Sequence, residues 1–458
     1  QRVLGGPGFN FVDAPLETTI AAATKLTGRS RGGWSLGLLD AVTLREEARF
    51  RDAAGTDRTA TVEPRANYFV GRLKKELRQG NSTVGFGMTA VNRDLGDDAL
   101  DPIFRSAAYV AGLDWNHAWS NRRFAFDGAI VGSRNLGRAA SIDALQTSPA
   151  RYFQRPDKER YRRDPTKTSL TGYMGEMTFA KLSGLHWKGT ITYQEYAPGF
   201  EINELGFLGN TDMRSISPLI SYEENRPGKR LRNWAQYLFW NPTWNFDGDM
   251  TFNGVGAISV AELPNFWNLF FRADWRPPVF DDRLTRGGPV ARVVPGGGFQ
   301  AEISSDRRKS FTYGAYSSYS WNDSGGRGLS IEPYLTLRPT TALRVSLQPS
   351  YSRTHAIAQY VTERSDALAV DTYGRRYIFA TLDQNQLSLV TRVDWTFTPA
   401  LSLQLFAQPL VAAADFQDYK EFARPREFAF KVYGRDAGTI ARDADGLYTV
   451  DPDAAGAA

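Results

Sequence analysis

Cysteine, histidine and long apolar runs are absent or scarce in this sequence of 458 residues. With no cysteine, a disulfide scaffold, thiolate metal sites and cysteine nucleophiles are excluded. No run of about 18 apolar residues occurs, which excludes a helical membrane protein. Three histidines leave few nitrogen ligands for a metal. The net charge of +5 is spread along the chain without a basic stripe, which argues against nucleic-acid binding.

Glycine and aromatic residues are abundant instead, with 42 Gly and 13% Phe, Trp and Tyr. In the stretch 266–275, FWNLFFRADW, the odd positions from Trp267 to Trp275 are apolar, and the even ones are mostly polar. Successive side chains of a β-strand point to opposite faces, so this stretch predicts a strand with one apolar face. A strand of a membrane-spanning barrel turns such a face to lipid and its polar face to a wet lumen, with aromatic residues at both interfaces.

The same alternation recurs in about 18 segments. The predicted strands are 16–27, 34–43, 67–75, 83–90, 109–116, 124–130, 173–179, 187–193, 215–222, 234–240, 251–260, 266–275, 299–304, 311–321, 329–337, 343–351, 387–397 and 401–411. Short turns mostly alternate with longer loops, which is typical of outer-membrane barrels and has no counterpart in a soluble sandwich. The predicted fold is therefore all-β, an antiparallel transmembrane β-barrel, with one short helix around 140–145.

The expected organisation is an irregular lead-in at 1–15, the barrel at 16–415, and an extracellular loop or tail at 416–458. If the short turns are periplasmic, the first strand runs inwards, although barrel chains usually begin in the periplasm. We therefore expect further strands outside this sequence and a complete barrel of about 20–22 strands. Proline lacks the N–H that a strand ladder needs. Local bulges are therefore expected at Pro218, Pro333, Pro349 and Pro409.

Several stretches resemble a family without an assigned function, the domain of unknown function 5916. They are AATKLTGRS, GWSLGLLDAVT, VEPRANYFVGRLKKELRQGNSTVGFGMTAVNRDL, SPARYFQRPD, YAPGFEINELGFLGNTD and FARPREF. The resemblance implies an outer-membrane barrel, with barrel strands before residue 1 and after residue 458. Such proteins often carry an N-terminal domain similar to carbohydrate-binding modules. The family has no established catalytic residues, so the resemblance implies none here.

Polar residues at alternating strand positions are expected to line the lumen: Asp114, Asn116, Asp127, Lys188, Asn268, Arg272, Asp274, Glu332, Arg344, Gln348, Arg392 and Asp394. Tryptophans near strand ends are expected to form the membrane-interface girdle: Trp34, Trp115, Trp187, Trp267, Trp275, Trp321 and Trp395. The recurring Asp-Trp pairs could mark a charged ring that selects solutes, but salt-bridged pairs beside the girdle are the favoured interpretation. The mixed signs argue against strong selectivity for anions or cations.

Other polar and aromatic groups are weaker candidates for a site. The basic segment Arg151, Arg155, Lys158, Arg160, Arg162, Arg163 and Lys167 is expected to be a solvated loop; the alternatives are a lumen constriction and a contact with lipopolysaccharide or a partner. His117 and His186 lie beside short turns, and His355 is expected in a long loop, too dispersed for a metal or triad. The acidic pieces 247–250 and 280–284 lack EF-hand spacing. Tyr237, Phe239, Trp240 and Trp244 could stack sugars, although interface anchoring is favoured.

These patterns predict an integral barrel of the cell outer membrane of a Gram-negative bacterium. Its expected role is a channel, or an uptake or docking component, for a solute or polymer, with carbohydrate suggested by family analogy alone. A scaffold plugged by its own loops or by a partner subunit is the second hypothesis, and a barrel enzyme the disfavoured third. We expect no catalytic role and no cofactor. The expected partners are outer-membrane lipid and lipopolysaccharide, carbohydrate, and other outer-membrane or periplasmic subunits, without nucleic acid.

Overall fold

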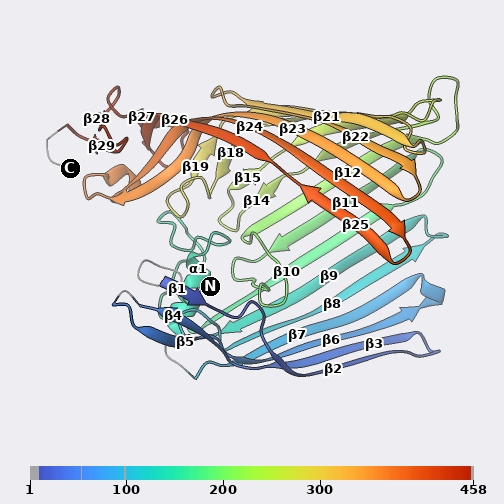
Figure 1. The fold of residues 1–458 in the computed structure, drawn as a ribbon, viewed down its shortest axis with the longest axis horizontal. Helices are drawn as coiled ribbons and strands as arrows, with labels where there is room; N and C mark the ends of the chain where they lie inside the picture. The colour runs from blue at the N-terminus through green and yellow to red at the C-terminus, as the bar shows by residue number, and fades with distance from the viewer. Residues whose placement is uncertain (1–9, 53, 97–99, 455–458) are drawn as a thin grey trace. The chain divides into compact units, whose positions relative to one another are not determined.

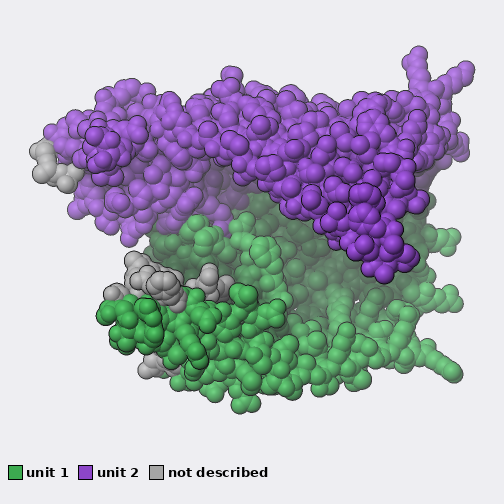
Figure 2. All heavy atoms as spheres, viewed as in Figure 1, with its two compact units in different colours: residues 1–183, 190–216, 243–248 green, residues 184–189, 217–242, 249–458 purple. Residues whose placement is uncertain are grey.

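A computed structural model describes residues 10–52, 54–96 and 100–454. The chain is all-β with antiparallel strand pairing, as predicted, and carries the helix α1 at Ala139–Thr147. No helix in the described ranges is both long and apolar enough to span a membrane. Two compact units divide the chain (Figure 2), one with residues 1–183, 190–216 and 243–248, the other with 184–189, 217–242 and 249–458. They are called unit 1 and unit 2 and are described separately.

Unit 1 is built on an antiparallel meander in which each strand pairs with the next (Figure 1). Its strands are β2 (Ile20–Arg29), β3 (Trp34–Thr43), β6 (Arg65–Leu77), β7 (Ser82–Asp94), β8 (Ala107–Trp119), β9 (Phe124–Leu136) and β10 (Ser169–Lys181). A separate small sheet joins β1 (Asn10–Asp13), β4 (Glu46–Arg51) and β5 (Asp57–Glu63). The 3-10 turn η1 (Arg78–Gly80) links β6 to β7.

The strands β11 (Trp187–Tyr196) and β12 (Met213–Glu224) each contribute residues to both units. In unit 2 the pairing continues through β12, β13 (Asn233–Trp240), β16 (Val255–Glu262), β17 (Asn268–Arg276), β20 (Gly296–Ser304), β21 (Phe311–Asn322), β22 (Arg327–Thr340), β23 (Leu343–Ser365) and β24 (Arg375–Thr398). β24 then pairs with both β25 (Leu401–Ala407) and β26 (Leu410–Phe422), and β26 pairs with β27 (Phe430–Val432).

Short elements occupy the longer connections. They are β14 (Thr243–Trp244), β15 (Met250–Phe252), β18 (Val279–Asp281) paired with β19 (Ala291–Val293), η2 (Val370–Thr372), and β28 (Thr439–Arg442) paired with β29 (Tyr448–Asp451). The connections between β2 and β3, β6 and β7, and β8 and β9 are short, whereas those after β3, β7 and β9 are long. The predicted alternation of connection lengths is thus present in unit 1. The transmembrane barrel and its strand count remain predictions.

Some predicted loops are strands. The charged stretch 44–64 contains the hairpin β4–β5, in which Ala48 is fully buried and Arg51 pairs with Asp57 across the strands. Cross-strand pairs of opposite charge thus stabilise a hairpin that its polar composition concealed. Strand β1 lies in the expected lead-in, although 1–9 are outside the described residues. β23 extends to Ser365, so His355 lies in a strand rather than in a loop, and β27 to β29 lie in the expected tail at 416–458.

Bulges were predicted at four prolines. One of these prolines lies at a break between two strands, and the register does not shift at the other three. Pro409 falls in the gap between β25 and β26, both of which pair with β24. Pro333 and Pro349 instead face each other, because the register is the same at Ile331/Tyr351 and at Leu335/Leu347. The register of β12 is likewise constant on either side of Pro218. Both prolines lack the N–H donor, and the antiparallel register nevertheless passes through the pair without a bulge.

Each sheet has an apolar face and a polar face. In unit 1, Leu113 of β8 lies opposite Ile130 of β9, and these side chains are 53% and 51% exposed. In unit 2, Leu269, Phe271 and Trp275 are exposed along one face of β17. Contiguous rows of half-exposed aliphatic and aromatic side chains are rare on a soluble protein. These apolar faces therefore identify surfaces that require a non-aqueous environment or a partner.

Candidate functional site

The polar face of unit 1 carries paired charges. Asn116 of β8 lies opposite Asp127 of β9 and donates a 2.9 Å hydrogen bond from its Nδ2 to the Asp127 carboxylate. Arg72 of β6 donates from Nη2 to Asp114 at 2.8 Å. These residues lie on the face opposite Leu113 and Ile130. The predicted group Asp114, Asn116 and Asp127 is thus brought together on one polar surface, and the pairing with Arg72 was not predicted.

In unit 2 the remaining predicted polar residues alternate with apolar ones in the same way. Arg344 lies opposite Asp394 and Ser346 opposite Arg392, while Lys188 binds Glu223 at 2.5 Å. Asn268, Arg272 and Asp274 occupy the polar side of β17, and Glu332 and Gln348 occupy the polar sides of β22 and β23. Whether this surface lines a lumen stays a prediction.

Neutral polar residues form a row across five strands of the same face. Directly opposite one another lie Gln300, Ser318, Ser330, Ser352 and Gln386, on β20 to β24. This row was not among the polar residues predicted from the sequence, most of which are charged. The alternate serines and glutamines of β21 to β24 were the signal that could have found it. Hydroxyl and amide groups in a row can exchange hydrogen bonds with water or with a hydroxylated solute.

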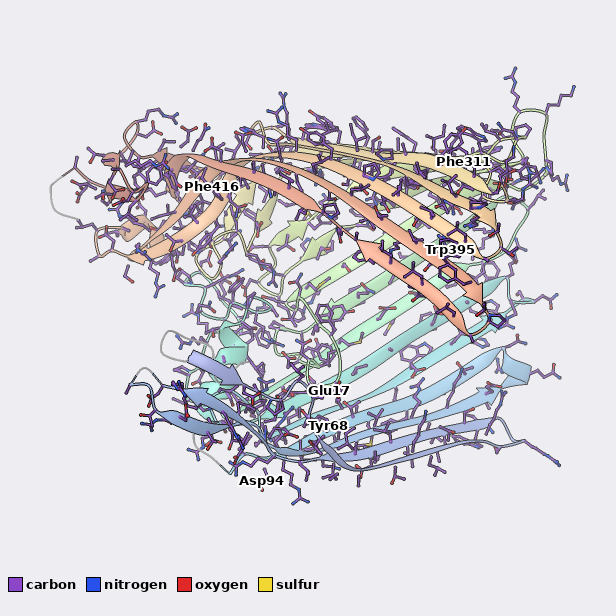
Figure 3. The ribbon with its side chains drawn as sticks, in the orientation of Figure 1. Glu17, Tyr68, Asp94, Phe311, Trp395 and Phe416 are labelled. Carbon is purple, nitrogen blue, oxygen red and sulfur yellow. The ribbon has the colours of Figure 1, made fainter. Side chains whose placement is uncertain are left out.

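Aromatic residues gather near both ends of the apolar faces. In β21, Phe311 and Tyr313 are exposed at the short-turn end, and Trp321 is exposed about 26 Å further along the strand. Figure 3 shows Phe311 and Trp395 towards the short turns and Phe416 towards the opposite end of unit 2. Such spacing matches the apolar band of about 25 Å between two aromatic girdles.

The predicted girdle tryptophans differ in exposure. Exposed on their strands are Trp34, Trp187, Trp275, Trp321 and Trp395. Trp115 is half-buried, and Trp267 lies one residue before β17, where its ring packs edge-on against Tyr313 with centroids 5.5 Å apart. Phe266 has a φ of +65°, and β17 begins two residues after it, at Asn268, rather than at the start of FWNLFFRADW. Their position in lipid stays a prediction.

Long connections of unit 1 fold onto its polar face and form a packed body, here called the loop core and defined as residues 137–168, 197–212 and 243–248. Its apolar centre contains Ile142 and Leu145 of α1, Phe153, and Leu170 of β10. The prediction of a short helix near 140–145 is confirmed by α1. The loop core covers strand residues that would otherwise be open to water.

Buried ion pairs hold the loop core together. Arg151 lies 2.7 Å from Glu201, and Lys158 lies 2.5 Å from Asp212 and 3.6 Å from Asp247. Arg155 lies 3.1 Å from the same Asp247 carboxylate. The side chains of all these residues are at most 6% exposed. A charge this deeply buried is tolerated only when it is paired.

The expectation of a solvated basic loop is therefore wrong for Arg151, Arg155 and Lys158, which are buried. It describes Arg160, Arg162, Arg163 and Lys167, which are exposed. The physical reason is pairing: the carboxylates that neutralise the buried cations come from segments far along the chain. The ion pair of Arg151 with Glu201 connects two of the family stretches, SPARYFQRPD and YAPGFEINELGFLGNTD. The basic residues of the first and the acidic residues of the second were the sequence signal that could have predicted this contact.

Close backbone contacts anchor the loop core to the sheet. The Glu201 amide donates to Ser133 Oγ at 3.0 Å, and Asn135 Nδ2 donates to the Glu201 carbonyl at 3.3 Å. Ser133 lies on the polar face, opposite Gly172 of β10. A Cβ at Gly172 would come within 2.1 Å of the Phe200 amide nitrogen, so this position requires glycine. Segment 197–212 is thus seated directly on β9 and β10.

Glu204 adds a third buried contact. Arg93 Nη2 and Arg105 Nε lie 2.5 and 2.6 Å from its carboxylate oxygens. Burial alone would raise the pKa of Glu204, but the charges of Arg105 and Arg93 outweigh it and lower the pKa below its usual value. The carboxylate therefore stays ionised and holds residue 204 against β7.

The motif FARPREF connects separate segments of unit 2 in a similar way. The Arg426 amide donates to the Val290 carbonyl at 2.7 Å, and the Arg426 side chain binds Asp249. Phe422 packs with Ala291, Tyr377 and Phe379 in a buried cluster. The described residues contain no group of three acidic or histidine side chains that could hold a metal. In the acidic piece 247–250, Asp247 and Asp249 are bound by arginine or lysine.

The histidines occupy separate environments. His117 Nδ1 lies 2.8 Å from Ser82 Oγ, His186 stacks on Tyr222, and His355 Nδ1 lies 2.9 Å from Asp383. A hydrolytic triad needs serine, histidine and a carboxylate in one place. Among the described contacts, the serine–histidine pair and the histidine–aspartate pair involve different histidines.

The proposed sugar-stacking aromatics do not form one platform. Phe239 is buried and Trp240 donates to Asn253 at 2.8 Å. Tyr237 and Trp244 are half-buried. A pocket of about 540 Å³ in unit 2 is lined by other residues, including Phe252, Asn253, Arg276 and Thr354.

Comparison with known proteins relates the whole arrangement to one family. A family model described as a domain of unknown function, DUF5916, matches residues 8–428. No match was found among curated proteins. Among solved structures, an anion-selective porin from Comamonas acidovorans is similar at 10% identity and a TM-score of 0.32, over 72% of this chain and 91% of the porin chain.

Proposed function

This chain belongs to the DUF5916 family, and we propose that it is an integral β-barrel of the cell outer membrane of a Gram-negative bacterium. The observation that carries the proposal is the pair of faces in each sheet. One is lined by exposed apolar side chains with aromatic residues near both ends, and the other is polar and charge-paired. Only helices and closed barrels satisfy all backbone hydrogen bonds inside a bilayer. An antiparallel sheet with these faces therefore fits a barrel.

The proposed role is passage or docking of a small hydrophilic solute. The row from Gln300 to Gln386 supports a neutral, hydroxylated substrate, with carbohydrate the leading class. Paired charges such as Arg72 with Asp114 support weak ion selectivity, because each cation has an anion beside it. The loop core would narrow the path. The proposal includes no catalytic role.

Thiol labelling tests the assignment of faces, and the cysteine-free sequence gives an unlabelled background. Gln386 and Leu387 are neighbours on β24 with opposite orientations. We expect Gln386→Cys in lipid vesicles to react readily with a membrane-impermeant maleimide, and Leu387→Cys to stay unlabelled. A thiol in hydrocarbon does not ionise to the reactive thiolate. Both variants should label after denaturation, and rapid labelling of Leu387→Cys in vesicles would refute a lipid-facing apolar surface.

A scaffold plugged by its own loops is the second candidate, favoured by the buried ion pairs of the loop core. Planar-bilayer recordings of the full-length protein separate the two. A channel should give stepwise conductance that neutral sugars reduce. A plugged scaffold should insert and remain silent. Silence in the wild type together with stepwise conductance after disruption of the loop core would identify the loops as the plug.

A further inference from the structure

An unpaired cationic patch lies on the apolar side of unit 2, just past the aromatic residues at the long-connection end. It is built on β21 to β24. By register, Trp321 is opposite Arg327, which is opposite His355, which is opposite Asp383. One step towards the short turns lie Tyr319, Leu329, Arg353 and Asn385, again opposite one another. The two arginines thus sit diagonally on adjacent strands, with their Cβ atoms about 7 Å apart.

Neither arginine is neutralised. Arg327 and Arg353 are exposed, and within the described residues neither side chain makes an ion pair or a hydrogen bond. By contrast, the Asp383 carboxylate has a partner, because its Oδ1 lies 2.9 Å from His355 Nδ1. Two guanidinium groups and an imidazole share one carboxylate, so the patch carries a net positive charge.

The patch lines an open pocket of about 500 Å³. Its lining is Tyr319, Gly325, Arg327, Gly328, Leu329, Arg353, His355 and Asp383. The next row towards the short turns is apolar, with Ile331, Tyr351 and Leu387 opposite one another and all exposed. A cationic pocket next to an apolar row is complementary to a molecule with an anionic head and an acyl chain.

We propose that this pocket binds the phosphorylated headgroup of lipopolysaccharide in the outer leaflet. The inference rests on the proposed outer-membrane location, in which long connections face the cell exterior. Guanidinium groups bind phosphate through paired, charge-assisted hydrogen bonds. Arg327 and Arg353 bracket one phosphate, His355 is held in place by Asp383, and the row from Ile331 to Leu387 receives an acyl chain. The apolar row selects a lipid over free phosphate.

Native mass spectrometry of the full-length protein in detergent tests the site, with bis-phosphorylated lipid A as the added probe. We expect the wild type to retain one lipid A. The double variant Arg327→Gln/Arg353→Gln should bind at least about tenfold more weakly, because two charge-assisted hydrogen bonds are lost. The matched control Arg230→Gln/Arg338→Gln removes two exposed arginines at the short-turn end and should bind like the wild type.

Further probes identify the ligand chemistry. Dephosphorylated lipid A should bind as weakly as the double variant does, and millimolar inorganic phosphate should not displace lipid A. Equal binding of phosphorylated and dephosphorylated lipid A, or equal binding by both double variants, overturns the proposal. Displacement by inorganic phosphate overturns the role of the apolar row. Insertion of each variant into lipid vesicles is measured in parallel. Failure of the wild type to insert overturns the proposed function, whereas normal insertion without selective lipid A binding overturns this inference alone.

Discussion

Replacing Lys158 with methionine is expected to open the loop core. Methionine keeps an unbranched side chain, one heavy atom shorter than lysine. The substitution leaves Asp212 buried without its cation and leaves Arg155 as the remaining cation beside Asp247. Breaking a buried ion pair by removing one partner costs about 3–5 kcal/mol. Hydrogen exchange in the peptides 148–168 and 197–212 should therefore accelerate by about two to four orders of magnitude. Mass-spectrometric hydrogen exchange of the reconstituted protein measures this directly.

Two variants serve as controls for Lys158→Met. Arg163→Ala breaks an ion pair with Asp143 in which the arginine is 43% exposed, and exposed pairs contribute less than about 1 kcal/mol. Lys158→Met/Asp212→Asn also removes the orphaned carboxylate and should recover part of the protection lost in the single variant. Unchanged exchange in Lys158→Met would show that the loop core does not depend on this ion pair.

Placing a charge on the apolar face should destabilise the protein strongly if that face lies in lipid, as proposed. Ile130 lies near the middle of the apolar face of β9, between Phe126 and Arg134 on the same side. An arginine at the midplane of a bilayer costs about 2–4 kcal/mol. We expect Ile130→Arg to lower the free energy of unfolding by that amount in lipid vesicles. Urea titration followed by tryptophan fluorescence is the measurement.

The adjacent residue provides the control. Ala129 lies on the polar face, directly opposite Asp114 on β8 and Glu176 on β10. An arginine introduced there would meet two carboxylates, so Ala129→Arg should change the free energy of unfolding by less than about 1 kcal/mol. Equal costs for the two substitutions would contradict the assignment of one face to lipid and the other to water.

Local alternation was sufficient to predict most strands. In a segment such as Phe311–Asn322, the alternation of residues in the sequence already shows which side chains share a face. The cross-strand register then places each face beside the same face of the neighbouring strand. The loop core was not predictable in this way. The sequence around Arg151 and Lys158 predicts solvated cations. Their burial depends on Glu201 and Asp212, which lie about 50 residues further along the chain.

The prolines and the cationic patch of unit 2 also depend on contacts between residues that are far apart in the sequence. Pro333 and Pro349 each predicted a bulge when considered alone, whereas the structure places them opposite each other with the same register on both sides. Arg327, Arg353 and His355 come from two strands, and the sequence indicates neither that they share a face nor that Asp383 lies beside the histidine. Properties that depend on which residues meet across strands become visible only with the register.

The length of β23 and β24 has a consequence for the cell surface. In the proposed orientation, the 14 residues of β23 after Tyr351 continue outward beyond the apolar band for about 45 Å. This extension is not a loose loop, because Tyr377 and Phe379 of β24 pack with Phe422 of β26 in a dry cluster near its tip. It would therefore stand clear of the lipid as a stiff ridge. Antibodies or phage tail proteins approaching an intact cell would meet this ridge before they reached the membrane.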